Sequence, residues 1–198
     1  MSDSLPLHRQ VWTVPNLLSI GRLVCVPVFL WLIATDHRLW ALWVLVGSGI
    51  TDYLDGKIAR KYGLVTRLGQ LLDPAADRLY ILSTIVALAW KSIIPWWLVA
   101  VLLVREVMVF ALGPTLRKHR LPIPPVHFVG KSATFCLIYG FPLVLLGSLD
   151  NVWGHVARPI GWSFIWWGTV LYWLAGVMYV GQVRGMVRTR QQAPAEQQ

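Results

Sequence analysis

Long apolar runs separated by short polar stretches fill most of this chain. The runs lie at about 14–34, 39–60, 71–90, 94–116, 125–148 and 159–184. A transmembrane helix needs roughly 20 mostly apolar residues. The second and third runs are strongly apolar only over 39–51 and 79–90, so they reach that length only if both helices continue into the polar stretch between them. The pattern predicts an all-α membrane protein, a bundle of about six transmembrane helices.

The composition agrees with this class. Hydrophobic residues make up 56% of the 198 residues and charged residues 14%, with a mean hydropathy of +0.57. Those values exclude an ordinary soluble domain. We expect one membrane domain over residues 1–190 and a polar, disordered tail at 191–198. Cys25 and Cys136 lie within apolar runs and indicate no disulfide framework.

The basic residues fall mainly on one side of the predicted bundle. That side carries Arg9, Lys57, Arg60, Lys61, Arg67, Arg78, Arg117, Lys118, Arg120, Arg184, Arg188 and Arg190. Only Arg38, Lys91 and Arg158 lie on the other. Cytoplasmic loops carry the excess of Lys and Arg, so we expect an integral protein of a bacterial plasma membrane with both termini in the cytoplasm. The net charge of +9 then faces anionic membrane lipids, and no nucleic-acid reader motif is present.

One polar stretch, residues 52–77, holds four of the nine acidic residues. Asp52 and Asp55 are three residues apart, and Asp73 and Asp77 are four apart, so each pair shares one face of its helix. If the two helices pack side by side, the four carboxylates repel one another unless cations lie among them. Oxygen ligands favour Mg²⁺ or Mn²⁺, and four carboxylates can hold two such ions roughly 3.5–4 Å apart. The alternative is a polar interfacial turn with incidental acids.

Small and basic residues accompany the aspartates. Gly56 and Ala59 leave room for close helix approach or for a ligand against the backbone. Gly69 opens the turn into the second carboxylate pair. Arg60 and Lys61 place positive charge at the rim, where an anionic phosphate group would arrive.

The stretch reads D-x2-D-G-x2-A-R-x8-G-x3-D-x3-D, which resembles the signature of the CDP-alcohol phosphatidyltransferase family at every fixed position. The resemblance extends to Pro15-Asn16-x2-Ser19-x2-Arg22, to Arg105-Glu106 and to Gly130-Lys131. It implies a CDP-diacylglycerol donor with its cytidine near Gly56 and Ala59, an alcohol acceptor, release of CMP, and a homodimer.

The resemblance also implies individual roles for the aspartates. Asp77 would take the proton from the acceptor hydroxyl and also bind metal, while Asp52, Asp55 and Asp73 are chiefly metal ligands. Arg60 and Gly69 belong to the same donor-binding stretch.

Three cations interrupt the apolar runs. By resemblance, Arg105 and Lys131 bind the phosphate of the acceptor. The alternative for Lys131 is snorkelling to the interface. For Arg105 it is an ion pair with Glu106, although adjacent residues on a helix do not face each other. Asn16, Ser19 and Arg22 share one helix face and are expected to line the cleft; a helix cap and a snorkelling arginine are the alternatives.

The acceptor remains open at this point. The stretch Leu71-Leu72-Asp73-Pro74-Ala75-Ala76-Asp77-Arg78 is most similar to the glycerol-acceptor branch, whose acceptor is glycerol 3-phosphate or phosphatidylglycerol. The enzymes that use glycerol 3-phosphate commonly show G-K-x-K-T. This chain has Gly130-Lys131-Ser132-Ala133-Thr134, without the second lysine. Serine and inositol phosphate are other acceptors of the family. A membrane prenyltransferase is one rival from another class, but its aspartate motifs usually lie in two distant loops of a longer chain. A divalent-cation transporter is another, but its acids should line a path at the membrane middle, whereas here they cluster at one face.

Overall fold

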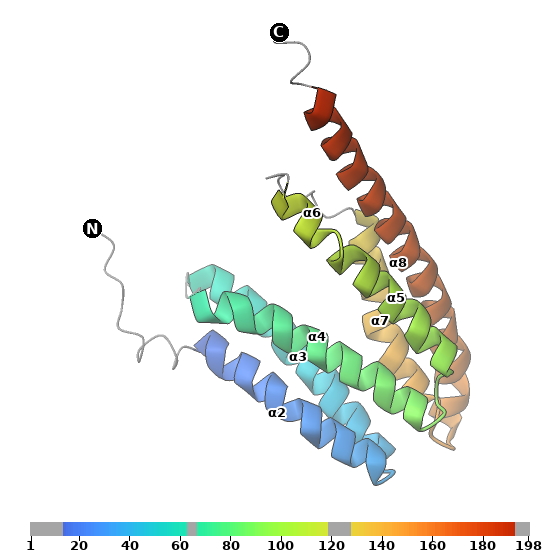
Figure 1. Ribbon diagram of the computed structural model, residues 1–198. Coiled ribbons are helices and arrows are strands. Elements are labelled where there is room, and N and C mark those ends of the chain that lie inside the picture. The colour runs from blue at the N-terminus through green and yellow to red at the C-terminus, as the bar shows by residue number, and fades with distance from the viewer. Residues whose placement is uncertain (1–13, 63–66, 119–127, 193–198) are drawn as a thin grey trace. The chain divides into compact units, whose positions relative to one another are not determined.

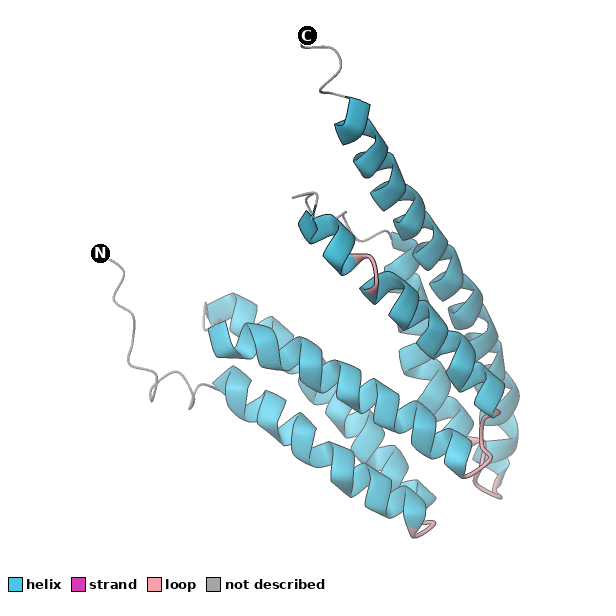
Figure 2. Cartoon of the chain, in the orientation of Figure 1, coloured by secondary structure: helices cyan, strands magenta, loops and turns pink. Residues whose placement is uncertain are grey.

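The computed structural model describes residues 14–62, 67–118 and 128–192, and within them the side chains of 14–20, 22, 52–62, 67–78, 115, 117, 118 and 189–192 are not described. All regular structure in this part of the chain is helical, as predicted, with no strand (Figure 2). The chain divides into two compact units, Met1–Ile94 with Leu145–His155, and Pro95–Val144 with Val156–Gln198.

The first unit is built on three antiparallel helices. They are α2 (Val14–Ala34), α3 (Arg38–Tyr62) and α4 (Arg67–Trp90). Both α3 and α4 pack against α2, and the three run in alternating directions (Figure 1). Phe29, Ile33, Ala41 and Leu88 form a core with almost no exposed surface. The Phe29 and Tyr80 rings meet with their centroids 6.5 Å apart, which joins α2 to α4 directly.

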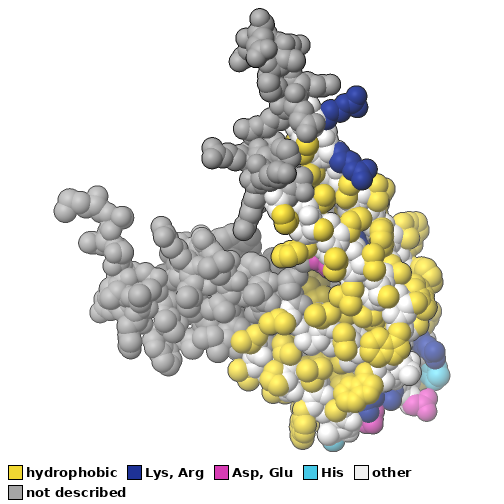
Figure 3. Space-filling model, viewed as in Figure 1, with side chains coloured by type: hydrophobic (Ala, Val, Ile, Leu, Met, Phe, Trp, Pro, Cys, Tyr) yellow, Lys and Arg dark blue, Asp and Glu magenta, His cyan; other side chains and the backbone are white. Residues whose placement is uncertain are grey.

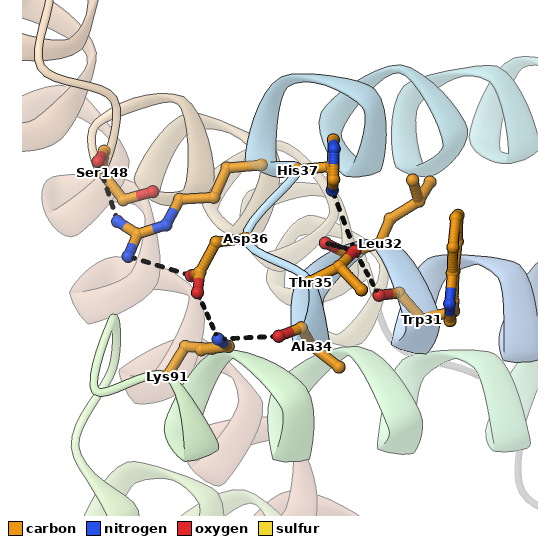
Figure 4. Close-up of polar contacts among 9 residues, drawn as sticks. Trp31, Leu32, Ala34, Thr35, Asp36, His37, Lys91 and Ser148 are labelled. Atoms are coloured by element: carbon orange, nitrogen blue, oxygen red, sulfur yellow. Dashed lines mark hydrogen bonds and ion pairs between the residues drawn. The ribbon is translucent and has the colours of Figure 1, made fainter.

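A cluster of charged groups, which we call the polar clasp (Asp36, Arg38 and Lys91), ties one end of this unit together (Figure 4). Lys91 Nζ lies 2.8 Å from Asp36 Oδ2 and also donates to the Ala34 carbonyl at 3.1 Å. Arg38 lies 3.5 Å from Asp36 Oδ1 and donates to the Ser148 carbonyl at 3.0 Å. The clasp therefore brings the end of α4, the start of α3 and the α7–α8 loop to one place.

The second unit contains α5 (Trp96–Phe110), α6 (Gly113–Lys118), most of α7 (Phe128–Leu146) and most of α8 (Val152–Gln192). Glycines let α7 and α8 approach closely. A Cβ on Gly161 would lie 2.7 Å from the Val144 backbone nitrogen, and one on Gly140 would lie 2.9 Å from Ile165 Cγ1. On the other side of α8, Trp97 of α5 packs against Trp166 with ring centroids 5.6 Å apart.

Two of the predicted helix boundaries differ from the structure for identifiable reasons. The run at 94–116 is not one helix, because α5 ends at Phe110 and α6 starts at Gly113. Pro114 has no N–H to continue the ladder, and Gly113 beside it weakens helix propensity. The last helix starts at Val152 rather than near 159, because Asn151 Oδ1 accepts a hydrogen bond from the Gly154 N–H and caps it.

The last helix also continues further than expected at its other end. It reaches Gln192, two residues into the tail expected at 191–198, and the remaining six residues lie outside the described part.

Large hydrophobic side chains are widely exposed on the described surface (Figure 3). Two helical stretches, Phe128–Leu146 and Val152–Arg188, are long and apolar enough to cross a bilayer, and about a third of each such window is buried within the chain. Shorter apolar stretches lie in α2, α3 and α4, at Leu23–Ala34, Arg38–Thr51 and Leu79–Trp90. Exposed tryptophans such as Trp40 and Trp90, near the clasp end, suit a membrane interface. The described part of the chain is thus all-helical, with two stretches that could cross a membrane by length and composition.

Candidate active site

The predicted site residues of the polar stretch lie on two neighbouring antiparallel helices. Asp52, Asp55, Gly56, Ala59 and Arg60 belong to α3, and Gly69, Asp73 and Asp77 belong to α4. Their side chains lie outside the described set, so the backbone register carries the geometry. Gly69 falls within the first turn of α4 rather than before it.

The two aspartate pairs stand at matching heights. The polar clasp holds the start of α3 and the end of α4 together, so distances along both helices can be measured from that end. At about 1.5 Å per residue, Asp52 is about 21 Å from Arg38 and Asp77 about 20 Å from Trp90. Asp55 and Asp73 are each 17 residues from the same ends (38 to 55, 73 to 90), or about 26 Å. Each residue of one pair therefore has a counterpart on the other helix.

The buried stripe of α3 leads directly to the first pair. Ala41, Leu45 and Ser48 are buried, at the alternating spacings of four and three that define one helix face. The next positions in the same series are 52 and 55. Asp52 and Asp55 thus occupy register positions that continue the inward stripe.

The same holds for α4 when it is followed toward its start. Tyr80, Thr84 and Leu88 are buried and share one face. Stepping back from Tyr80 by three and then four residues gives Asp77 and Asp73. Both pairs therefore continue buried faces of their own helices, and α3 and α4 each pack against α2.

The stripe of α2 shows a similar relation to the first motif. Phe29 and Ile33 are buried, and Arg22 lies seven residues, or two turns, before Phe29. Ser19 and Asn16 follow at steps of three. The side chains of all three lie outside the described residues, so their place in a cleft stays a prediction.

Ser48 is the described polar side chain nearest to the aspartates in register. It is 5% exposed, and its Oγ atom has no hydrogen-bond partner among the residues that the structure describes. Every other helical Ser or Thr with a described side chain donates back to a carbonyl four residues earlier, as Thr84 does to Tyr80 O at 2.8 Å. A buried hydroxyl without a partner costs about 1–3 kcal/mol. Ser48 is thus an orphaned polar atom one helical turn from Asp52.

Arg105, the first predicted acceptor ligand, lies on α5 and packs against α8. Its side chain is 13% exposed, and its Nη1 atom lies 3.4 Å from Glu106 Oε1. The expectation that adjacent residues do not meet was therefore wrong here, because the long arginine side chain can bend across to its neighbour. The Nε atom donates to the Tyr172 carbonyl at 3.2 Å, and Cζ lies 3.8 Å from the Tyr172 ring centroid.

Lys131, the second predicted acceptor ligand, lies in the first turn of α7 and is exposed. Two residues on, Ala133 is fully buried. The position that holds a second lysine in the G-K-x-K-T pattern is therefore a core position here. No three metal-ligating side chains gather among the residues whose side chains are described, a set that excludes the four aspartates.

Sequence reasoning missed Ser48, Tyr172 and Gly176. Ser48 could have been found by stepping back one turn from Asp52. Gly176 gave a weaker signal, because it is one of several small residues along α8, and it faces α5 rather than α7.

Comparison with known proteins identifies the family. The sequence profile of the CDP-alcohol phosphatidyltransferase family matches residues 12–178. A cardiolipin synthase (CMP-forming) of Streptomyces coelicolor is 53% identical over 90% of this chain and 86% of its own length. A putative cardiolipin synthase of Mycobacterium tuberculosis is 43% identical over 91% and 87%, respectively. A CDP-diacylglycerol–glycerol-3-phosphate 3-phosphatidyltransferase of Rickettsia felis is 34% identical over 84% and 89%.

The profile covers the aspartate helices, the Arg105 helix and most of α8. The chain therefore belongs to the CDP-alcohol phosphatidyltransferase family and is an enzyme of phosphatidyl transfer.

Proposed function

We propose that this enzyme transfers the phosphatidyl group of CDP-diacylglycerol to phosphatidylglycerol, forming cardiolipin and CMP. The observation that carries the proposal is the placement of two aspartate pairs at matching heights on the continued inward stripes of α3 and α4. A site of this kind suits displacement at phosphorus, in which the acceptor hydroxyl forms a new P–O bond as the bond to CMP breaks.

The donor set fits two divalent cations. It consists only of carboxylate oxygens, which hard ions such as Mg²⁺ or Mn²⁺ prefer. The orphaned Ser48 hydroxyl adds a polar atom one turn deeper, where an apolar residue would otherwise suit the core. When bound, the ions would neutralise the charge of the diphosphate and of the leaving phosphate.

The chain's own groups would perform the remaining tasks. Asp52, Asp55 and Asp73 hold the ions. Asp77 also ligates and takes the proton from the acceptor hydroxyl, which requires the hydroxyl to approach within hydrogen-bond distance. Arg60 attracts the phosphates at the rim of the site.

The small residues leave space for the donor. Gly56 and Ala59 present little side chain beside the second carboxylate, so cytidine can lie against the backbone of α3. Gly69, in the first turn of α4, likewise has no side chain, so the donor can approach the backbone of that helix closely.

Two features of the described residues favour an acceptor with a single negative charge. Ala133 is buried where a second lysine would be needed, and Glu106 cancels part of the charge of Arg105. Phosphatidylglycerol carries one phosphodiester charge, while glycerol 3-phosphate carries close to two. The names of the two relatives with 53% and 43% identity point to the same acceptor.

The proposal places the site at the cytoplasmic surface of a bundle of about six spans with both termini inside. The excess of Lys and Arg in the loops on that side supports this orientation.

The test is an acceptor assay with purified protein in lipid nanodiscs. CMP release from CDP-diacylglycerol is measured with Mg²⁺ and, in parallel, phosphatidylglycerol, glycerol 3-phosphate, serine or inositol phosphate. We expect phosphatidylglycerol to give the highest kcat/KM, at least tenfold above the others, with loss of activity in EDTA. A higher kcat/KM with glycerol 3-phosphate would overturn the acceptor, and metal-independent release of CMP would overturn the site.

A further inference from the structure

We propose that Tyr172 and Gly176 of α8, which we call the Arg105 seat, fix the orientation of the Arg105 guanidinium and so set the affinity of the enzyme for its acceptor. This inference rests on the proposed role of Arg105 in binding the acceptor phosphate. Tyr172 and Gly176 act through Arg105 and are positioning residues.

Tyr172 holds the guanidinium in two independent ways. The face of its ring lies 3.8 Å from Arg105 Cζ, a cation–π distance that fixes the plane of the guanidinium. Its main-chain carbonyl accepts a hydrogen bond from Nε at 3.2 Å, which fixes the rotation within that plane. Tyr172 therefore constrains both the plane and the rotation of the Arg105 guanidinium.

Gly176 makes the second of these contacts accessible. In an α-helix the Tyr172 carbonyl is directed along the axis toward residue 176. A Cβ at 176 would lie 3.2 Å from Arg105 Nε, 3.4 Å from its Cγ and 3.1 Å from Met108 Cε. At such spacings a side chain at 176 requires Arg105 or Met108 to shift by a few tenths of an ångström, so a larger residue disturbs the contact of Nε with the carbonyl.

The seat orients the arginine without cancelling its charge. Glu106, at 3.4 Å, lowers the net charge near Arg105, whereas an aromatic ring and a carbonyl carry no net charge. A pre-oriented guanidinium loses less conformational entropy when it binds a phosphate. Arginine is favoured for phosphate binding because its planar guanidinium can donate two parallel hydrogen bonds. Misorientation should therefore weaken acceptor binding more than it affects the donor.

The experiment compares KM for phosphatidylglycerol and for CDP-diacylglycerol in nanodiscs. The variants are Gly176→Ala, Tyr172→Leu, which removes the ring, and Tyr172→Phe, which retains both the ring and the carbonyl. The matched control is Gly168→Ala on the same helix, where a Cβ would lie 3.0 Å from Cys136 and Leu137 but does not meet Arg105. Thermal stability is measured for every variant. Arg105→Ala and the double variant Arg105→Ala/Gly176→Ala complete the set.

We expect Gly176→Ala and Tyr172→Leu to raise the acceptor KM by roughly three- to tenfold with the donor KM within twofold of wild type. Tyr172→Phe should restore wild-type values, and Gly168→Ala should lower only the melting temperature. In the Arg105→Ala background, Gly176→Ala should add no further change in KM, because the two act as a unit.

The outcomes separate this inference from the proposed function. If Arg105→Ala raises the acceptor KM but neither α8 variant does, the seat is wrong and the acceptor role of Arg105 stands. Equal changes in donor and acceptor KM would also overturn the seat. The same would follow from an equal rise of the acceptor KM in Gly168→Ala, because the effect would then come from helix packing and not from Arg105. An unchanged acceptor KM in Arg105→Ala overturns both. If Gly176→Ala does not accumulate in the membrane, the acceptor KM values of Tyr172→Leu and Tyr172→Phe test the inference on their own.

Discussion

The Lys91 ammonium lies 2.8 Å from the Asp36 carboxylate and joins the end of α4 to the turn between α2 and α3. Asp36 has a φ of 59°, in the left-handed region that Asp tolerates better than most residues, and its carboxylate contacts both cations of the clasp. The contact sets the relative height of α3 and α4, and with it the heights of the two aspartate pairs.

The clasp predicts a pH dependence of stability. The hydrogen bond from Lys91 is the main cause that lowers the pKa of Asp36 below its usual 3.8, with smaller help from the charges of Lys91 and Arg38. A lowered folded-state pKa means that stability is present above the usual value and is lost as the pH falls through the folded-state pKa. Melting curves in detergent should show Asp36→Asn below wild type at neutral pH.

The difference between the two should shrink as the pH falls below 3.8 toward the lowered folded-state pKa, where the wild-type carboxylate becomes protonated. Lys91→Met should cost less stability in the Asp36→Asn background than in wild type, because the ion pair is already lost and only the hydrogen bond to the Ala34 carbonyl remains to be removed. A difference in melting temperature that persists unchanged at low pH would show that Asp36 acts through its backbone conformation instead.

Close packing of α7 on α8 depends on Gly161. An added Cβ would lie 2.7 Å from the Val144 nitrogen and 2.9 Å from the Leu143 carbonyl carbon, and neither backbone atom can move cheaply. Gly161→Ala should therefore destabilise the protein by about 1–3 kcal/mol. Gly181→Ala, on the same helix with nothing within 4 Å, should be neutral or stabilising by up to about 1 kcal/mol. Similar melting temperatures for both would contradict this packing.

Substitution of Ser48 tests whether its buried hydroxyl has a functional role or a structural one. Removing an unpaired buried hydroxyl should leave stability equal or higher, since its desolvation cost of about 1–3 kcal/mol disappears. If the hydroxyl instead supports the aspartate site, Ser48→Ala should weaken Mn²⁺ binding several-fold without lowering the melting temperature. Ser83→Ala, whose hydroxyl bonds to its own helix and is exposed, serves as the control. Unchanged Mn²⁺ affinity in Ser48→Ala would remove Ser48 from the site.

The proposed base and the pure ligands should respond differently to substitution. Asp77→Asn should retain metal-dependent binding of CDP-diacylglycerol but lose turnover, while Asp55→Asn should lose both. Binding can be followed by titration with the donor in the presence and absence of Mg²⁺. Loss of donor binding in Asp77→Asn as well would make Asp77 only a ligand.

Much of the fold followed from residue pattern alone. The first predicted run, 14–34, coincides with α2, because an apolar run starting beside Pro15 and ending before the turn at Thr35 has clear limits. The family was evident because the spacing of its acids depends on helix geometry, which local sequence contains.

The features that sequence did not reveal depend on single contacts between distant residues or on local breaks. The cap by Asn151 moved the start of α8, and Gly113 with Pro114 ended the fourth run early. The position of Arg105 on Tyr172 joins residues 67 apart in sequence, and no periodicity indicates it. The predicted cleft residues Asn16, Ser19 and Arg22 have side chains outside the described set.

The central claim is that the two aspartate pairs hold two divalent ions in one site. Electron paramagnetic resonance of the purified enzyme titrated with Mn²⁺ tests it most directly, because ions roughly 3.5–4 Å apart couple magnetically. We predict two Mn²⁺ per chain with a spin-coupled spectrum, and loss of the coupled signal in Asp52→Asn and in Asp73→Asn, one from each helix. A single uncoupled Mn²⁺, or a coupled pair that survives both substitutions, would contradict the account.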